Sequence, residues 1–167
     1  MAKLAEQSWA GKVYLGADHR GFPMKRALME FLLGEGFAVE DLGTYSDERV
    51  DYPDYARLVA ERVAREEGAA GVLICGSGVG ICMAANRIKG ARAAPLYAPQ
   101  VAEMTRRHNN ANIACFSGDW QTPEEAKELL RIFLTTGFEG GRHLRRIRKL
   151  DFLDREEAGE LTKEGES

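Results

Sequence analysis

The stretch Gly71–Arg87, GVLICGSGVGICMAANR, joins an apolar run to a glycine-rich turn and then to a helical pattern. Its first five residues are apolar throughout, which is typical of a strand that is buried on both faces of a parallel sheet. Three glycines alternate after Cys75, and a short helical pattern follows them. The stretch therefore predicts a strand, a turn and a helix in succession, with a thiol at the turn.

The same alternation of strand and helix continues in both directions from this stretch. The further strands are expected at residues 12–18, 38–43, 91–97 and 112–118. The further helices are expected at residues 22–37, 52–68, 99–109 and 122–137, and a C-terminal helix at 142–154. Strict alternation with apolar central strands indicates a parallel sheet that is covered on both faces. The sequence therefore predicts a Rossmann-like, doubly wound α/β fold with a parallel five-stranded sheet, helices on both faces and a C-terminal helix.

Length and composition limit the class of protein. The chain has 167 residues, of which 44% are hydrophobic and 29% are charged, and its formal net charge is -3. These values favour a single globular domain, which we place at residues 12–154, between a polar leader at 1–11 and a polar tail at 155–167 that we expect to fray. The negative charge argues against a general nucleic-acid binder. Because neither a run of about 18 apolar residues nor a signal peptide is present, we expect no membrane partner and a cytoplasmic location.

The cysteines and histidines form no disulfide or metal pattern. Cys75, Cys82 and Cys115 include no C-x-x-C pair, which favours free thiols in a reducing compartment. We interpret Cys82 and Cys115 as packing residues, since the first lies in an expected helix and the second in an apolar strand. The three histidines are isolated from one another in the sequence, so we expect no metal site.

The glycine turn does not match the nucleotide-binding loops. Its spacing is G-x-G-x-G rather than G-x-G-x-x-G, and the next strand does not end in the acidic residue that binds a ribose hydroxyl. No Lys-Ser or Lys-Thr pair follows, which excludes a P-loop. Alternating glycine amides beside the start of a helix suit a small oxyanion. A tight turn around a buried thiol explains the same residues, and the turn alone does not decide between these two interpretations.

If the turn holds an oxyanion, the same positive field favours the thiolate form of Cys75 and makes it a better base or nucleophile. Ser77 adds a hydroxyl donor to the turn. Asp18 and His19 follow the first expected strand, and the ends of parallel strands share one rim of a sheet. These two residues can therefore join Cys75, although an acidic residue at this position can also serve only as a helix cap.

Two further pairs of candidate residues lie in the second half of the chain. His108 and Asn109 end the helix at 99–109, where they can simply complement the helix dipole or cap the helix. Arg142 and Arg146 are four residues apart and so lie on one helical face, a spacing suited to gripping one phosphate with two guanidinium groups. No aromatic residues are interleaved with these arginines, which argues against a nucleic-acid surface.

Five motifs in order along the chain resemble the ribose-5-phosphate isomerase B family, which also includes the galactose-6-phosphate isomerase subunits. The motifs are GADHRGF, DLGTYSDERVDYPDYA, GVLICGSGVGICMAANRIKGARAA, RRHNNAN and FEGGRHLRRI. They run from about Val13 to Arg148, which is nearly the whole chain. The resemblance implies an aldose–ketose isomerase of a phosphosugar that needs no metal or organic cofactor. It also implies a homodimer or tetramer with the active sites at the subunit interface.

The resemblance assigns roles to individual residues. Cys75 is the implied base that moves a proton between C2 and C1 through a cis-enediolate, since the loop contains no Glu that could replace it. Ser77 and the loop amides stabilise the enediolate oxygen, and His108 assists opening of the furanose ring. The remaining residues position the sugar or bind its phosphate: Asp18, His19, Gly76, Gly78, Val79, Gly80, Asn109, Arg142 and Arg146.

One departure from the family pattern leaves the substrate open. Relatives commonly carry a Gly-x-Arg after the fifth strand, whereas this chain has Asp119 at that place. An acidic residue near a phosphate is unfavourable, so either Asp119 points away or the sugar differs. Ribose 5-phosphate is the expected substrate, in the pentose phosphate pathway, with galactose 6-phosphate, allose 6-phosphate and a tetrose phosphate as alternatives. A non-catalytic phosphosugar-binding subunit and a Rossmann dehydrogenase are the remaining hypotheses, and the wrong glycine spacing weakens the second.

Overall fold

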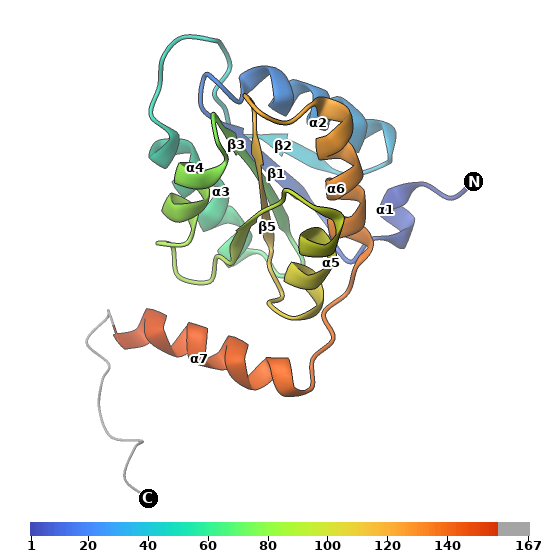
Figure 1. The fold of residues 1–167 in the computed structure, drawn as a ribbon, viewed down its shortest axis with the longest axis vertical. Helices are drawn as coiled ribbons and strands as arrows, with labels where there is room; N and C mark the ends of the chain where they lie inside the picture. The colour runs from blue at the N-terminus through green and yellow to red at the C-terminus, as the bar shows by residue number, and fades with distance from the viewer. Residues whose placement is uncertain (157–167) are drawn as a thin grey trace, which may run out of the picture.

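The computed structural model describes residues 1–156, and Figure 1 shows one sheet with helices on both of its faces. The strands are β1 (Val13–Ala17), β2 (Val39–Asp41), β3 (Ala70–Cys75), β4 (Ala93–Pro95) and β5 (Ile113–Ser117). The helices are α1 (Leu4–Gln7), α2 (Phe22–Gly34), α3 (Tyr52–Arg65), α4 (Val79–Ala85), α5 (Pro99–Arg107), α6 (Pro123–Thr135) and α7 (Arg142–Glu156). None of the helices in this part of the chain is long and apolar enough to cross a membrane.

The sheet is parallel throughout, with the strand order β2-β1-β3-β5-β4. The register of β3 and β5 runs from Gly71 opposite Ile113 to Cys75 opposite Ser117. The carboxyl ends of β1, β3 and β5 therefore lie together at one edge of the sheet, which we call the carboxyl edge. Their amino ends lie together at the opposite edge, the amino edge. The predicted fold class is confirmed.

Alternate residues of the strands contribute to two apolar clusters, one on each face of the sheet. On one face, β1, β3 and β5 pack against α2 and α6, with single buried residues contributed by α1 and α5. On the other face, the same strands pack against α3 and α4. This division follows from the period of two along a strand, which sends neighbouring side chains to opposite faces.

Helix α3 packs closely on the sheet because two strand positions facing it are glycine. A Cβ atom on Gly16 would lie 2.8 Å from Cγ2 of Val59, and one on Gly71 would lie 2.8 Å from Cγ1 of the same side chain. Val59 is completely buried between these two strand positions. The close approach fixes β1 and β3 beneath α3 and thereby fixes the two loops that leave these strands at the carboxyl edge.

The segment before β1 packs on the domain, although its composition predicts only a polar leader. Leu4 in α1 is buried, and the Trp9 indole donates a hydrogen bond of 3.0 Å to the carbonyl of Phe133. The guanidinium of Arg106 lies 3.8 Å from the Trp9 ring centroid. The tail expected from residue 155 begins inside α7, and residues 157–167 of that expected tail lie outside the described residues.

Helix α7 stands apart from the two helical layers and lies beyond the amino edge, at the bottom of Figure 1. The connection at 136–141 leads to it from α6. Ile147 is buried, whereas the side chains of Leu150, Phe152 and Leu153 remain 46%, 45% and 55% exposed. Within the single chain, α7 therefore leaves much of its apolar surface uncovered.

We predict that Gly71→Ala destabilises the protein by about 1–3 kcal/mol, because the added methyl group would overpack against Val59 and Ile113. The control is Gly34→Ala at the end of α2, where a Cβ atom meets nothing within 4 Å. This control should leave the free energy of unfolding unchanged or raise it slightly. Urea denaturation of both variants measures the difference, and equal stability of the two would contradict the proposed packing.

Candidate active site

Cys75 is the last residue of β3, and its thiol is buried at the carboxyl edge. The backbone N–H of Gly78 donates a hydrogen bond of 3.2 Å to Sγ of Cys75. Gly78 has a left-handed φ of 78°, and a Cβ atom there would lie 2.8 Å from the backbone of Phe116. Only glycine fits this position, so the turn brings an amide donor to the sulfur at a point where no side chain has room.

The loop after β5 holds the glycine turn in place. The Ser117 hydroxyl donates a hydrogen bond of 2.6 Å to the carbonyl of Gly76, and the N–H of Gly118 donates one of 2.9 Å to the carbonyl of Cys75. The predicted hydroxyl donor, Ser77, instead accepts the N–H of Val79 at 3.1 Å. Two of the predicted oxyanion donors, the amides of Gly78 and Val79, are thus engaged by groups of the turn itself.

Asp18 and His19 lie at the same edge, as the topology predicts. The buried carboxylate of Asp18 accepts the backbone N–H groups of Arg20 and Gly21, each at 3.0 Å. It therefore shapes the turn that leads into α2, although the N-cap of that helix is Gly21 and receives no side-chain capping bond. His19 lies with Nδ1 3.2 Å from the carbonyl of Val50 in the loop between β2 and α3.

The unexpected acidic residue, Asp119, is paired with a cation. Its Oδ2 lies 2.5 Å from a guanidinium nitrogen of Arg20. This ion pair covers Gly76, since a Cβ atom on that glycine would lie 3.1 Å from Asp119 and 3.2 Å from Nε of Arg20. Asp119 thus remains beside the glycine turn, and Arg20 compensates its charge.

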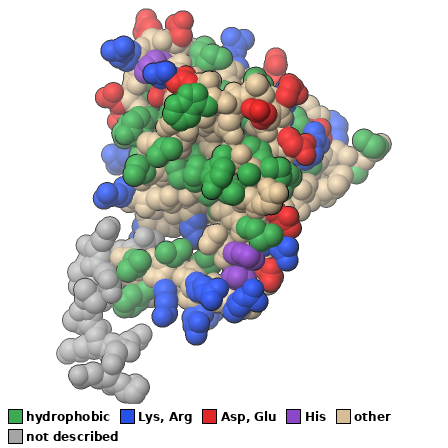
Figure 2. Space-filling view, viewed as in Figure 1, with side chains coloured by type: hydrophobic (Ala, Val, Ile, Leu, Met, Phe, Trp, Pro, Cys, Tyr) green, Lys and Arg blue, Asp and Glu red, His purple; other side chains and the backbone are tan. Residues whose placement is uncertain are grey.

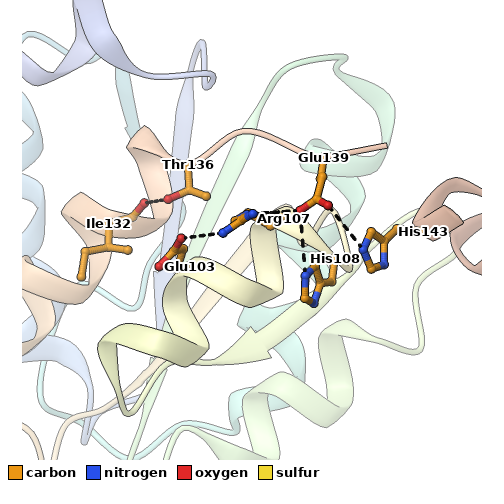
Figure 3. Close-up of polar contacts among 7 residues, drawn as sticks. All are labelled: Glu103, Arg107, His108, Ile132, Thr136, Glu139 and His143. Atoms are coloured by element: carbon orange, nitrogen blue, oxygen red, sulfur yellow. Dashed lines mark hydrogen bonds and ion pairs between the residues drawn. The ribbon is translucent and has the colours of Figure 1, made fainter. Parts of the chain in front are cut away.

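The other predicted residues form a second group at the amino edge, where α5 ends and α7 begins (Figure 3). His108 follows α5, and its Nε2 lies 4.0 Å from Oε2 of Glu139. Asn109, Arg142 and Arg146 are exposed there. The side chains of Arg142 and Arg146 share one face of α7, as their spacing predicts.

His143 belongs to this second group, although the sequence analysis does not single it out. Its ring stacks on the His108 ring with the centroids 4.2 Å apart and the planes 14° apart. The His143 side chain is buried, and its Nε2 has no hydrogen-bond partner within the described residues. Burial lowers the pKa of His143, and electrostatic interaction with His108 and with the Arg142 guanidinium adds to this effect. Burial and nearby charge therefore both disfavour protonation of His143.

The two groups of residues cannot meet within one chain. Cys75 is opposite Ser117 at the carboxyl end of β5, whereas His108 precedes the amino end of β5 at Ile113. Four residues of a strand span about 13 Å, so the sheet itself separates the groups. A single chain thus carries the base and the phosphate-binding arginines predicted for one site on opposite edges.

The second group contains imidazole and carboxylate atoms that could bind a metal ion, but arginine side chains surround them with positive charge. Ligand atoms of His108, Glu139 and His143 lie within 4.8 Å of one another. However, Arg107 already holds the Glu139 carboxylate, with Nε and a terminal nitrogen 3.2 Å and 3.1 Å from Oε2. The charges of Arg142 and Arg146 also act on His143. This concentration of positive charge favours an anion over a divalent cation.

An apolar groove of about 810 Å³ adjoins the glycine turn. Its lining includes Ser77 and Val79 of the glycine turn and α4, and also Tyr97 and Trp120. The side chains of Val79, Tyr97 and Trp120 are 50%, 72% and 77% exposed. Figure 2 shows hydrophobic side chains gathered across the middle of the viewed face, while Lys and Arg side chains gather along α7 below. Large exposed apolar patches are typical of binding surfaces in soluble proteins.

Comparisons with known proteins give one consistent result. A family profile described as Ribose/Galactose Isomerase matches residues 13–150. Ribose-5-phosphate isomerase B of Escherichia coli is 41% identical over 143 residues, covering 86% of this chain and 96% of that protein. The crystal structure of a ribose 5-phosphate isomerase from Thermotoga maritima has a TM-score of 0.82 at 46% identity, covering 85% and 98% of the two chains. Ribose-5-phosphate isomerase B from Mycoplasma genitalium, solved with bound ribulose-5-phosphate, has a TM-score of 0.83 at 42% identity, covering 87% and 97%.

The lowered pKa of His143 predicts a pH-dependent stability. In the unfolded chain this imidazole has its ordinary pKa of about 6.5, so it binds a proton more readily than in the folded chain as the pH decreases. The free energy of unfolding therefore decreases as the pH is lowered below about 6.5. His143→Phe keeps a ring against His108 and removes the titrating nitrogen. Between about pH 7 and about pH 5, the variant should lose less stability than the wild type. Denaturant unfolding across this range measures both, and parallel curves would contradict the burial argument.

Proposed function

The chain belongs to the ribose/galactose isomerase family, and we propose on this basis that it is an enzyme that interconverts ribose 5-phosphate and ribulose 5-phosphate. The similar proteins from Escherichia coli and Mycoplasma genitalium are both named ribose-5-phosphate isomerase B, and the structure of the second was solved with bound ribulose-5-phosphate. The observation that carries the proposal is the Cys75 thiol at the carboxyl edge, beside a loop of glycine amides. Removal of a proton next to a carbonyl needs a base beside donors for the developing oxyanion, and this loop offers both.

In the proposed reaction, Cys75 takes the proton from C2 of the open-chain aldose. The C2–H electron pair forms the C1=C2 bond, and the carbonyl pair moves to O1, giving the cis-enediolate. The loop amides of residues 76–80 and the Ser77 hydroxyl stabilise the negative charge on the enediolate oxygen by hydrogen bonds. To do so, they exchange their contacts within the turn for contacts with the substrate. Cys75 then returns its proton to C1, and a proton moves from O2 to O1, which leaves the ketose.

The second group, together with Asp18 and His19 of the first group, supplies the remaining roles in this proposal. His108 assists opening of the furanose ring, and Arg142 and Arg146 bind the phosphate. Asn109 positions the sugar from the amino edge, and Asp18 and His19 position it from the carboxyl edge. Exposure of both arginines supports this assignment, since they are free to receive an anion from outside the chain.

We propose that the active site forms between two copies of the chain, in a homodimer that can assemble further to a tetramer. Three observations support this assembly. The two groups of residues lie on opposite edges of one sheet. Leu150 and Leu153 of α7 are exposed, so α7 lacks cover in the single chain. The groove at Tyr97 and Trp120 offers an apolar surface beside the first group. A symmetric dimer would close two equivalent sites at once.

The Arg20–Asp119 ion pair bears on the choice of sugar. Because Arg20 neutralises Asp119, the acidic residue does not repel a phosphate as an unpaired carboxylate would. We therefore retain ribose 5-phosphate as the substrate, with galactose 6-phosphate, allose 6-phosphate and a tetrose phosphate as alternatives. We also propose residues 12–154 as the catalytic domain and, from the free thiols, the cytoplasm as the location.

We predict that the purified protein isomerises ribose 5-phosphate in the presence of a chelator, and that Cys75→Ala abolishes turnover but keeps phosphosugar binding. The loss should be about 10²-fold or more, as expected for removal of a general base. Cys82→Ala is the matched control, since it removes another buried thiol of the same face of the sheet and should keep turnover. Turnover of a different phosphosugar would correct the substrate, and binding without turnover would support the non-catalytic subunit instead.

Mixing two inactive variants tests the shared site. Cys75→Ala and His108→Ala should each be nearly inactive, because each lacks one group of the site. In randomly mixed dimers, half of the molecules carry one site with both intact residues, so about a quarter of the wild-type activity should return. The measurement is turnover after the two variants are unfolded and refolded together. No recovery in mixtures that exchange subunits would place the whole site in one chain.

A further inference from the structure

Glu139 is fixed to the end of α5 through both its backbone and its side chain. Its N–H donates a hydrogen bond of 3.0 Å to the carbonyl of Arg107. The guanidinium of Arg107 returns two contacts to Oε2 of Glu139, at 3.2 Å and 3.1 Å. Figure 3 shows Arg107 reaching Glu139 on one side and Glu103 on the other. The carboxylate therefore has little freedom to move relative to the residue that follows Arg107, which is His108.

The Glu139 carboxylate faces two imidazole rings. Its Oε2 lies 4.0 Å from Nε2 of His108, and its Oε1 lies 4.0 Å from Nε2 of His143. Gly140 and Gly141 both adopt positive φ values, 69° and 55°. The chain reverses at these two glycines, and this turn brings the His143 side chain close to Glu139. In Figure 3 both rings turn a nitrogen toward the carboxylate, and the second nitrogen of His108 points away from it.

We infer that Glu139 is a positioning residue for His108, and that its carboxylate holds the imidazole proton on Nε2 so that Nδ1 is free to act on the sugar. The tautomer of a histidine is set by the partner of its other nitrogen. A separation of 4.0 Å is longer than a hydrogen bond, so the inference requires this contact to shorten when the sugar binds. This inference rests on the proposed function, in which His108 assists ring opening.

His143 contacts both the His108 ring and the Glu139 carboxylate. Its buried ring stacks on the His108 ring and limits rotation of that imidazole. Nε2 of His143, which has no hydrogen-bond partner among residues 1–156, faces the same carboxylate, so Glu139 lies close to both rings. The pair of rings and the Arg107 clamp thus leave His108 one favoured orientation.

The proton balance of ring opening fits this tautomer. Nδ1 accepts the proton of the anomeric O1 hydroxyl, and the O1–H electron pair forms the C1=O1 carbonyl bond. The C1–O4 bond breaks, its electron pair passes to O4, and the imidazolium returns a proton to O4. His108 ends in its starting tautomer, with the Nε2 proton retained beside Glu139 throughout.

The test is Glu139→Gln, with Glu103→Gln as the matched control. Both variants remove a carboxylate that pairs with Arg107, but only Glu139 faces His108. Two rates are measured: isomerisation of ribose 5-phosphate, and exchange of solvent deuterium into ribulose 5-phosphate. The exchange needs the enediolate chemistry at Cys75 but no ring opening. Thermal unfolding checks that each variant folds, and Glu139→Asp, which keeps the charge, should regain part of any lost activity.

The expected result is that Glu139→Gln lowers isomerisation by about 10- to 100-fold, a part of what general acid–base catalysis contributes, while exchange stays within about threefold of wild type. Glu103→Gln should leave both rates unchanged. Equal loss of both rates in Glu139→Gln, or no loss of isomerisation, would overturn the positioning role. Wild-type protein with neither activity would instead overturn the proposed function, and this inference with it.

Discussion

The hydrogen bond from the N–H of Gly118 to the carbonyl of Cys75 joins the loop after β5 to the end of β3, where the glycine turn begins. It continues the pairing of β3 with β5 by one step, so the glycine turn begins from a strand end that cannot shift. The amide of Asp18 makes the same kind of contact with the carbonyl of Ile74, 3.2 Å away. The loops after β1 and β5 thus both hydrogen-bond to the carboxyl end of β3. Packing of Phe116 against Gly78 leaves the turn no room for another shape.

The fold could be predicted well from the sequence because its signals are local. The apolar run of β3 and the capping residues of α6 each identify an element without reference to the rest of the chain, and the α6 cap forms the reciprocal capping box. The strand order could not be predicted in the same way. β4 lies at the sheet edge and β5 between β3 and β4, and the local pattern of a strand does not record which neighbour it will pair with.

The candidate site could be predicted in part, and the same distinction between local and distant signals explains why. Cys75, Asp18 and His19 follow strands, so the topology rule alone brings them to one edge. His143 and Glu139 stand in the motif FEGGRH beside the predicted Arg142, but their contact with His108 depends on the turn at Gly140 and Gly141. The pairing of Asp119 with Arg20 joins residues about a hundred positions apart, and only the folded chain reveals it.

The separation of the two groups by the sheet has a thermodynamic consequence. In the proposed dimer, a sugar phosphate touches the glycine turn of one chain and the arginines of its partner, so it binds fully only to the assembled form. A ligand that binds one state of an equilibrium draws the population toward that state. Substrate would then act as a molecular link that tightens its own enzyme, and the tendency of the subunits to separate on dilution would fall as the concentration of sugar phosphate rises.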